Sequence, residues 1–299
     1  MAGDGEMGET ASKRTHVREK ARQLREKQRK RDLRNRLLLQ GGIGILVIAA
    51  IVAVVVIVVS SIKPDVGGPK NMASDGIVIG ANQEAVTTSA LEADESPIAT
   101  TVDPEVAHIR IYVDYLCPLC EAFETSNIDQ IEKWLDSGAA VLEIHPIAVL
   151  TSKSQGTEYS LRAANAAACV ADASPDAYFA FNRALFEEQP EEGTPGLTDD
   201  QLVSLAQKAG SSSIADCVED RDFSTWVKAA TDRAVNGPLP GTDVDRVEAT
   251  PTILVNGKHY TGSLTDEEEF QAFVVATNSE TRETATPTPT PTSTETDEG

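Results

Sequence analysis

Ile111-Tyr-Val-Asp-Tyr-Leu-Cys-Pro-Leu-Cys120 is the stretch where a strand pattern gives way to a helix pattern. Aliphatic, β-branched and aromatic residues dominate 108–115, which predicts a buried strand. After Cys120, apolar residues recur at spacings of three to five, which predicts a helix. A strand that runs directly into a helix places Cys117 at the first turn of that helix.

This position of Cys117 favours thiol chemistry. The first turn of a helix presents unpaired amides and the positive end of the helix dipole, and both stabilise a thiolate. A thiolate is the species that attacks and leaves in disulfide exchange. Pro118 suits the first helical position, where its missing N–H costs nothing. The sequence therefore predicts a thiol–disulfide redox site made of Cys117 and Cys120, with Pro118 and Leu119 between them.

A zinc site or a static disulfide is the other interpretation of two cysteines at this spacing. A structural zinc site needs four ligands, and the sequence has no second CxxC. The four histidines are scattered along the chain, at His16, His108, His145 and His259. The number of ligands argues against zinc, and we expect neither a metal nor another cofactor.

Residues 37–62 contain no charged residue and are mostly aliphatic. About twenty such residues, as a helix, cross a bilayer core of about 30 Å. Residues 1–36 hold 12 Lys/Arg against 6 Asp/Glu, and Lys63 is nearly alone after the span. The positive-inside rule then predicts a cytoplasmic basic arm, one transmembrane helix in the inner (cell) membrane and an extracytoplasmic remainder.

A cleaved signal peptide competes with this anchor. Its apolar core is usually about 7–15 residues, shorter than the span here, and we find no small-x-small cleavage site. The lengths favour an uncleaved signal-anchor and a single-pass protein.

The charge is unevenly distributed. The net charge is −21, and the residues after 36 hold 14 Lys/Arg against 41 Asp/Glu. Because the basic residues directly precede an apolar span, they indicate a segment beside anionic lipid rather than a nucleic-acid partner. All four cysteines follow the span, in a compartment where disulfides persist.

The rest of the chain predicts one domain between two non-globular segments. Residues 63–102 lack sustained periodicity and predict an extracytoplasmic tether, with one short strand near 76–79. Residues 278–299 repeat Thr-Pro and end acidic, so we expect a disordered tail. Between them the predicted elements are the first strand and helix, a second strand over 139–150, a helical insertion over about 157–237, a hairpin over 252–261 turning at Asn256-Gly257, and a last helix through Val275.

At this point the sequence resembles the DsbA-like branch of the thioredoxin superfamily. The resemblance rests on Tyr115-Leu-Cys-Pro-Leu-Cys120, on Ala249-Thr-Pro-Thr-Ile-Leu-Val-Asn-Gly257 and on the helical segment between them. It covers 103–277. It implies an α/β thioredoxin fold, βαβ followed by ββα, with an inserted helical subdomain, which agrees with the order of the predicted elements.

The resemblance also implies roles for particular residues. Thr250 would precede a cis proline, Pro251, that packs against the active-site sulfurs, and the Thr250 backbone would pair with an extended substrate. Family oxidases often carry a histidine between the cysteines, whereas this chain has Leu119. We therefore expect Cys117 to be acidic through the helix dipole and local amides, but less so than in those oxidases.

Cys169 and Cys217, 48 residues apart in the insertion, leave two interpretations open. They form a structural disulfide, or they are a second redox pair or two free thiols. The resemblance and the oxidising compartment favour the structural disulfide. Asp114, three residues before Cys117, either influences proton transfer at the site or is an ordinary carboxylate at a strand end.

Together these features predict a membrane-tethered oxidoreductase that introduces disulfides into reduced exported proteins. The resemblance implies a membrane redox partner that reoxidises the CxxC. A reductase or isomerase with the same residues is the alternative, and the redox potential distinguishes them. A peptide-binding module without turnover is a further alternative, and its binding would survive loss of Cys117.

Overall fold

The computed structural model describes residues 27, 29, 67–92, 95–101, 103–242 and 244–285. The chain divides into two compact units, 1–64 and 65–299, and the fold below is that of the second. The predicted span at 37–62 and nearly all of the predicted basic arm lie outside the described residues. Within the described part, no helix combines the length and the apolar character needed to cross a bilayer.

A five-stranded sheet in the order β1-β3-β2-β4-β5 forms the centre of the domain. Only β2 and β3 pair in parallel among the described strands, and the other neighbours are antiparallel. A parallel pair needs a crossover, which helix α2 (Pro118–Asp136) supplies. The strands are β1 (Ile77–Ile79), β2 (Ala107–Val113), β3 (Ala140–Pro146), β4 (Thr252–Val255) and β5 (Lys258–His259). The predicted mixed α/β fold with βαβ and a terminal ββα is confirmed.

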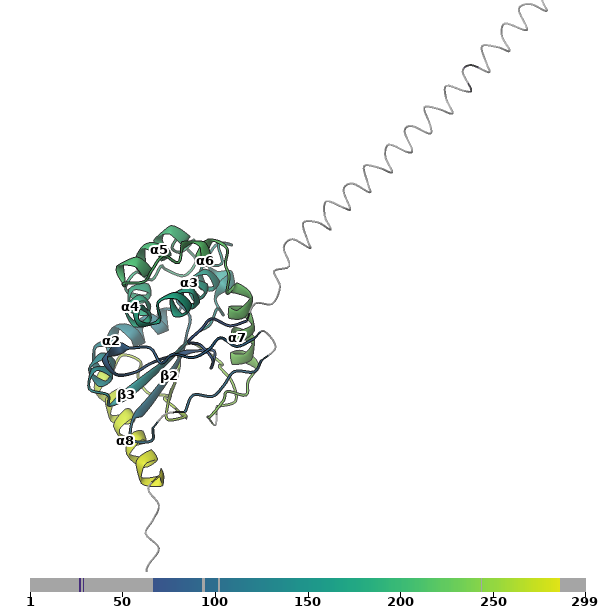
Figure 1. Ribbon diagram of the computed structural model, residues 1–299. Helices are drawn as coiled ribbons and strands as arrows, with labels where there is room; N and C mark the ends of the chain where they lie inside the picture. Colours follow the sequence, from purple (N-terminus) through teal and green to yellow (C-terminus); the bar gives the residue numbers. More distant parts are fainter. Residues whose placement is uncertain are drawn as a thin grey trace, which may run out of the picture. The chain divides into compact units, whose positions relative to one another are not determined.

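Helices cover both faces of this sheet. Helix α2 and helix α8 (Glu267–Ala285) lie together on one side, where α8 also contacts β2 and β4, and helix α7 (Ser224–Asn236) lies on the other side (Figure 1). The period of two in β2 explains this, because Ile111 enters the core beneath α2 whereas Tyr112 packs with Ala234 of α7. Helix α8 continues through Ala285, so the predicted start of the tail at 278 is too early.

The helical insertion is built around α3. The insertion comprises α3 (Tyr159–Ala173), α4 (Tyr178–Glu187), α5 (Asp199–Lys208), α6 (Ala215–Glu219) and α7 (Ser224–Asn236), with short 3-10 turns at Thr151–Lys153 and Pro175–Ala177. Every residue of α3 from Tyr159 to Ala171 is buried, because the helix contacts each of the other four. Its many alanines allow such close approach on all sides at no loss of helix propensity.

The segment over 67–101 differs from the predicted tether. Met72, Ile77 and Ile79 are each at most 1% exposed, and β1 extends the sheet antiparallel to β3. The short strand expected near 76–79 is therefore present, but it belongs to the domain. The segment adds a strand to an edge and buries isolated apolar residues, and neither feature produces the sustained periodicity that predicts folded structure from sequence.

A buried carboxylate ties this segment to the sheet. Glu143 of β3 is fully buried, and its oxygens accept hydrogen bonds from Ser74 Oγ (2.6 Å), Thr100 Oγ1 (2.6 Å), His108 Nε2 (2.7 Å) and Arg110 Nε (2.8 Å). Burial alone would raise the pKa of Glu143, but His145, His108 and Arg110 outweigh it and hold that pKa well below its ordinary value.

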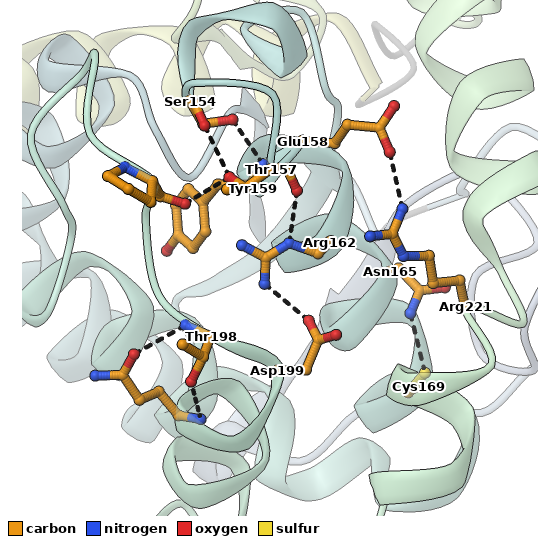
Figure 2. Close-up of polar contacts among 12 residues, drawn as sticks. Ser154, Thr157, Glu158, Tyr159, Arg162, Asn165, Cys169, Thr198, Asp199 and Arg221 are labelled. Atoms are coloured by element: carbon orange, nitrogen blue, oxygen red, sulfur yellow. Dashed lines mark hydrogen bonds and ion pairs between the residues drawn. The ribbon is translucent and has the colours of Figure 1, made fainter.

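Cys169 on α3 and Cys217 on α6 are joined by a disulfide, with their Cα atoms 6.1 Å apart. The pairing favoured by the resemblance is therefore the one present. Asn165 donates to the Cys169 sulfur at 3.8 Å and accepts from the backbone N–H of Phe223, so the disulfide lies in a polar junction of α3 with α6 and α7 (Figure 2).

Glu143→Ala should lower the free energy of unfolding by about 3–5 kcal/mol, because it leaves Arg110 buried without its partner. A carboxylate with a depressed pKa stabilises the fold above its unfolded pKa and loses that contribution as pH falls. As the pH falls below about 4.5, the free energy of unfolding of wild type, measured in urea, should therefore lose this contribution, whereas the variant has no such contribution to lose. Exposed Glu105→Ala is the control. A loss under about 1 kcal/mol in Glu143→Ala would contradict the network.

Replacing Cys169 and Cys217 by alanine should cost about 4 kcal/mol of unfolding free energy, from the entropy of a 48-residue loop. Urea unfolding of the double variant and its parent measures this, with Cys117 and Cys120 replaced by serine in both. Reductant should destabilise the parent alone. Equal stability of the two oxidised proteins would show that the disulfide adds nothing.

Candidate active site

Cys117 caps the N-terminus of α2, and Pro118 is the first residue of that helix. The Cys117 carbonyl accepts from the N–H of Cys120 (3.0 Å) and of Glu121 (3.2 Å), which places the cysteine within the first turn. Cys117 is 6% exposed and Cys120 1%, and both are free thiols. The predicted strand-to-helix junction thus holds both sulfurs, with Cys117 the more accessible of the two.

Thr250 lies beside Cys117 although the two residues are 133 positions apart in the sequence. The Cys117 thiol donates to the Thr250 carbonyl at 3.2 Å. The Thr250–Pro251 peptide is cis, as the resemblance implies, and a second cis peptide precedes Pro238. Sheet pairing explains the approach, because β4 starts at Thr252 opposite Tyr112, at the end of β2 that leads to the cysteines.

The two cysteines have opposite electrostatic surroundings. A hydrogen bond from the Cys120 thiol is the main cause that lowers the pKa of Cys117 to about 6. Burial opposes it, while a hydrogen bond with the Thr250 side chain and the amides of Cys120 and Leu119 add to it. Burial, and next the hydrogen bond with Cys117, raises the pKa of Cys120 well above its ordinary value. Cys117 is therefore the thiolate near neutral pH, and Cys120 is the buried thiol that supports it.

The dipeptide between the cysteines faces solvent. Pro118 is exposed, and Leu119 is 56% exposed. Leu119 contributes its backbone N–H to the Cys117 sulfur but no side-chain donor. The acidity of Cys117 thus rests on backbone amides, the neighbouring thiol and Thr250, as expected for a site without a histidine at this position.

Two buried carboxyl groups accompany the site. Asp114 is fully buried and accepts from the N–H of Leu116 at 2.9 Å, so it lies beneath the strand-to-helix corner. Glu124, four residues after Cys120 on α2, is 5% exposed, and burial raises its pKa to about 8. Sequence reasoning left the role of Asp114 open and missed Glu124. The sequence feature that could have identified Glu124 as a buried carboxyl is its position next to Phe123 on the apolar face of the predicted helix.

Glu124 belongs to a hydrogen-bonded network between α2 and α4. Asn182 donates to Glu124 at 2.6 Å and accepts from the Tyr115 hydroxyl at 3.0 Å, while the Tyr115 and Tyr178 hydroxyls are 3.3 Å apart. Burial raises the pKa of this carboxyl and so favours its neutral form within the network. Among the described residues, no group of three or more His, Cys, Asp or Glu side chains could hold a metal ion.

Comparisons with known proteins agree with this geometry. A family model described as thioredoxin matches residues 105–276. The structure is similar to the reduced disulfide bond oxidoreductase DsbG of Mycobacterium tuberculosis, with 27% identity, 72% of this chain and 95% of that chain covered, and a TM-score of 0.51. It is also similar to reduced DsbA of the same organism, with 28% identity, 71% and 100% coverage and a TM-score of 0.51.

A curated relative matches this chain over a part of its own length. The serine/threonine-protein kinase PknE of Mycobacterium tuberculosis is 32% identical over 129 residues. The match covers 41% of this chain and 23% of the kinase, so the chain spans about a quarter of the length of that relative. The similarity therefore concerns one part of the kinase chain.

The thiol of Cys117 should titrate to the thiolate with a midpoint near pH 6. Cys120→Ala removes the main cause of this acidity, so it should move the midpoint upward toward the ordinary value for a thiol. The ultraviolet absorbance of the thiolate, followed against pH, measures both proteins. A wild-type midpoint at the ordinary value, or one that Cys120→Ala leaves in place, would refute this electrostatic account.

Proposed function

We propose that this chain, which belongs to the thioredoxin family, is a thiol–disulfide oxidoreductase of the DsbA type that uses Cys117 and Cys120 to introduce disulfides into exported proteins. The observation that carries the proposal is the asymmetry of the two sulfurs. Cys117 lies at the N-terminus of α2 with a pKa of about 6, whereas Cys120 is buried behind it. A stabilised thiolate in the reduced form favours oxidation of the substrate.

The reaction is two successive thiol–disulfide exchanges. A substrate thiolate attacks the Cys117 sulfur of a Cys117–Cys120 disulfide, the bond between the two cysteines breaks, and Cys120 leaves and takes up a proton. A second substrate thiolate then attacks the substrate sulfur of the mixed disulfide and expels Cys117 as a thiolate. Two electrons pass from the substrate dithiol to the CxxC. The low pKa of Cys117 makes it a good leaving group in the last step.

The surroundings of the sulfur suit an extended substrate. Thr250 lies outside the β4 ladder, which begins at Thr252, and its carbonyl is 3.2 Å from the Cys117 sulfur. In our proposal this backbone pairs with the substrate chain next to its cysteine, in the manner of an added strand. The exposed Leu119 offers an apolar contact beside it.

The proposal includes a location outside the cytoplasm. Basic residues before an uncharged span over 37–62 support a single-pass anchor with a cytoplasmic N-terminus. The Cys169–Cys217 disulfide suits the oxidising side of that membrane. Each turnover leaves the CxxC reduced, so a membrane redox partner has to reoxidise it. Thiol labelling of intact cells with a membrane-impermeant reagent would place Cys117 outside, and labelling only after lysis would reject this location.

Cys117→Ser should reduce the oxidation of an unfolded, reduced protein substrate to the rate in buffer alone, because the attacked sulfur is lost and the remaining Cys120 is a buried thiol that has no partner for a disulfide at the site. Cys120→Ser should instead accumulate the mixed disulfide with Cys117, visible on a non-reducing gel. Loss of free substrate thiols measures the first effect. The variant without Cys169 and Cys217, tested where it is folded, is the control that should stay active. Full activity of Cys117→Ser would discard the mechanism.

A further inference from the structure

Asp114 is a fully buried carboxyl group for which the redox chemistry above has no use. Its Oδ1 accepts from the Leu116 N–H (2.9 Å) and from the Ser160 hydroxyl (2.7 Å), and its Oδ2 accepts from the Leu150 N–H (2.8 Å). All three partners donate. Burial raises the pKa of Asp114, and the hydrogen bonds from Leu150, Ser160 and Leu116 oppose that rise. The carboxylate form satisfies all three donors, whereas a protonated carboxyl would need an acceptor for its own proton.

These three partners come from three parts of the fold. Leu116 is in the corner between β2 and α2, directly before Cys117. Leu150 ends the loop that follows β3, and Ser160 is in the first turn of α3, in the helical insertion. The Asp114 backbone carbonyl also accepts from the Cys117 N–H at 3.0 Å. One residue thus joins the cysteine corner to the neighbouring loop and to the insertion.

The end of α3 that carries Ser160 is itself held firmly. Figure 2 shows the Tyr159 N–H donating to Ser154 Oγ at 2.9 Å, and Arg162 bridging the Thr157 carbonyl and the Asp199 carboxylate, both at 2.8 Å. Ser160 therefore presents its hydroxyl from a fixed position. A hydrogen bond to a fixed donor restricts Asp114 more than one to a mobile side chain would.

We propose that Asp114 is a positioning residue of the redox site, whose carboxylate fixes the corner before α2 against Leu150 and Ser160 so that the first-turn amides stay directed at the Cys117 sulfur. The inference rests on the proposed function. An aspartate that bonds the N–H two residues ahead stabilises a specific turn. Here that turn sets the entry of the chain into α2, and hence the direction of the Leu119 and Cys120 amides relative to the sulfur.

The sign of one measurable effect separates positioning from simple charge. Removal of a nearby negative charge, with the geometry unchanged, favours the thiolate and lowers the pKa of Cys117. Loss of the hydrogen bonds between the Asp114 carboxylate and its three partners weakens the hydrogen bonds from the first-turn amides to the sulfur and raises that pKa. Asp114→Asn keeps the size of the side chain but loses the charge and turns an NH₂ group toward at least one donor. The positioning role therefore predicts a higher Cys117 pKa in Asp114→Asn, whereas the loss of charge alone would lower that pKa.

Ser160→Ala separates the two causes further. It removes one donor to Asp114 and changes no charge, and it leaves the CxxC and its direct partners in place. Ser160 lies 43 positions after Cys117 in the sequence, and its hydroxyl is not among the groups that stabilise the Cys117 thiolate directly. A merely structural role for Ser160 would change the unfolding free energy and leave the titration of Cys117 alone.

The experiment titrates Cys117 by thiolate absorbance in the reduced full-length protein. We expect Asp114→Asn to raise the midpoint by about one pH unit, a tenfold loss of thiolate at pH values below both midpoints. Ser160→Ala should raise it in the same direction, with about a threefold loss. Asp129→Asn, at an exposed position on α2 itself, should match wild type. Ser160→Ala decides the question if Asp114→Asn does not fold.

A lowered or unchanged Cys117 midpoint in folded Asp114→Asn would overturn the positioning role, as would an unchanged midpoint in Ser160→Ala. These outcomes leave the proposed function intact as long as wild-type Cys117 titrates near pH 6 and forms a reversible disulfide with Cys120. A wild-type protein that fails either of those two tests would instead refute the proposed function. The two failures are therefore distinguishable.

Discussion

The interaction between the Cys117 sulfur and the first turn of α2 is the constraint on which the rest of the structure depends. A thiolate is stable there because backbone N–H groups, the Cys120 thiol and the Thr250 side chain all form hydrogen bonds with one sulfur atom. Among the described residues, no positively charged side chain is one of the main causes of this stabilisation. The site therefore depends on the geometry of the hydrogen bonds at the sulfur, and the surrounding fold fixes that geometry.

Each layer of the domain contributes to that geometry. Strand β2 delivers the chain to the corner, and its pairing with β4 brings Thr250 to within 3.2 Å of the sulfur. The insertion contributes through Ser160, which reaches the corner by way of Asp114. The helical subdomain is thus more than a cover for the sheet, because it bonds directly to the residue that shapes the start of α2.

The sequence predicts the local features of this site and none of its long-range contacts. The CxxC, the strand-to-helix change and the Asn256-Gly257 hairpin are local patterns, and the structure contains each of them. Glu143 and Asp114 have partners up to 69 positions away, which no local pattern encodes. The same reason explains the wrong expectation for 67–101, since that segment folds by pairing with β3 and by hydrogen bonds to Glu143. The approach of Thr250 and Pro251 came from resemblance, not from spacing.

The reduction potential of the Cys117–Cys120 couple tests the central claim most directly, because a stabilised Cys117 thiolate lowers the free energy of the reduced form. Equilibration of the protein with glutathione buffers of graded redox ratio measures it. Our account predicts a potential nearer the value of about −120 mV for a strong oxidant than the value of about −270 mV for a reductant. A potential at or below about −270 mV would show that the helix N-terminus does not stabilise the thiolate as described.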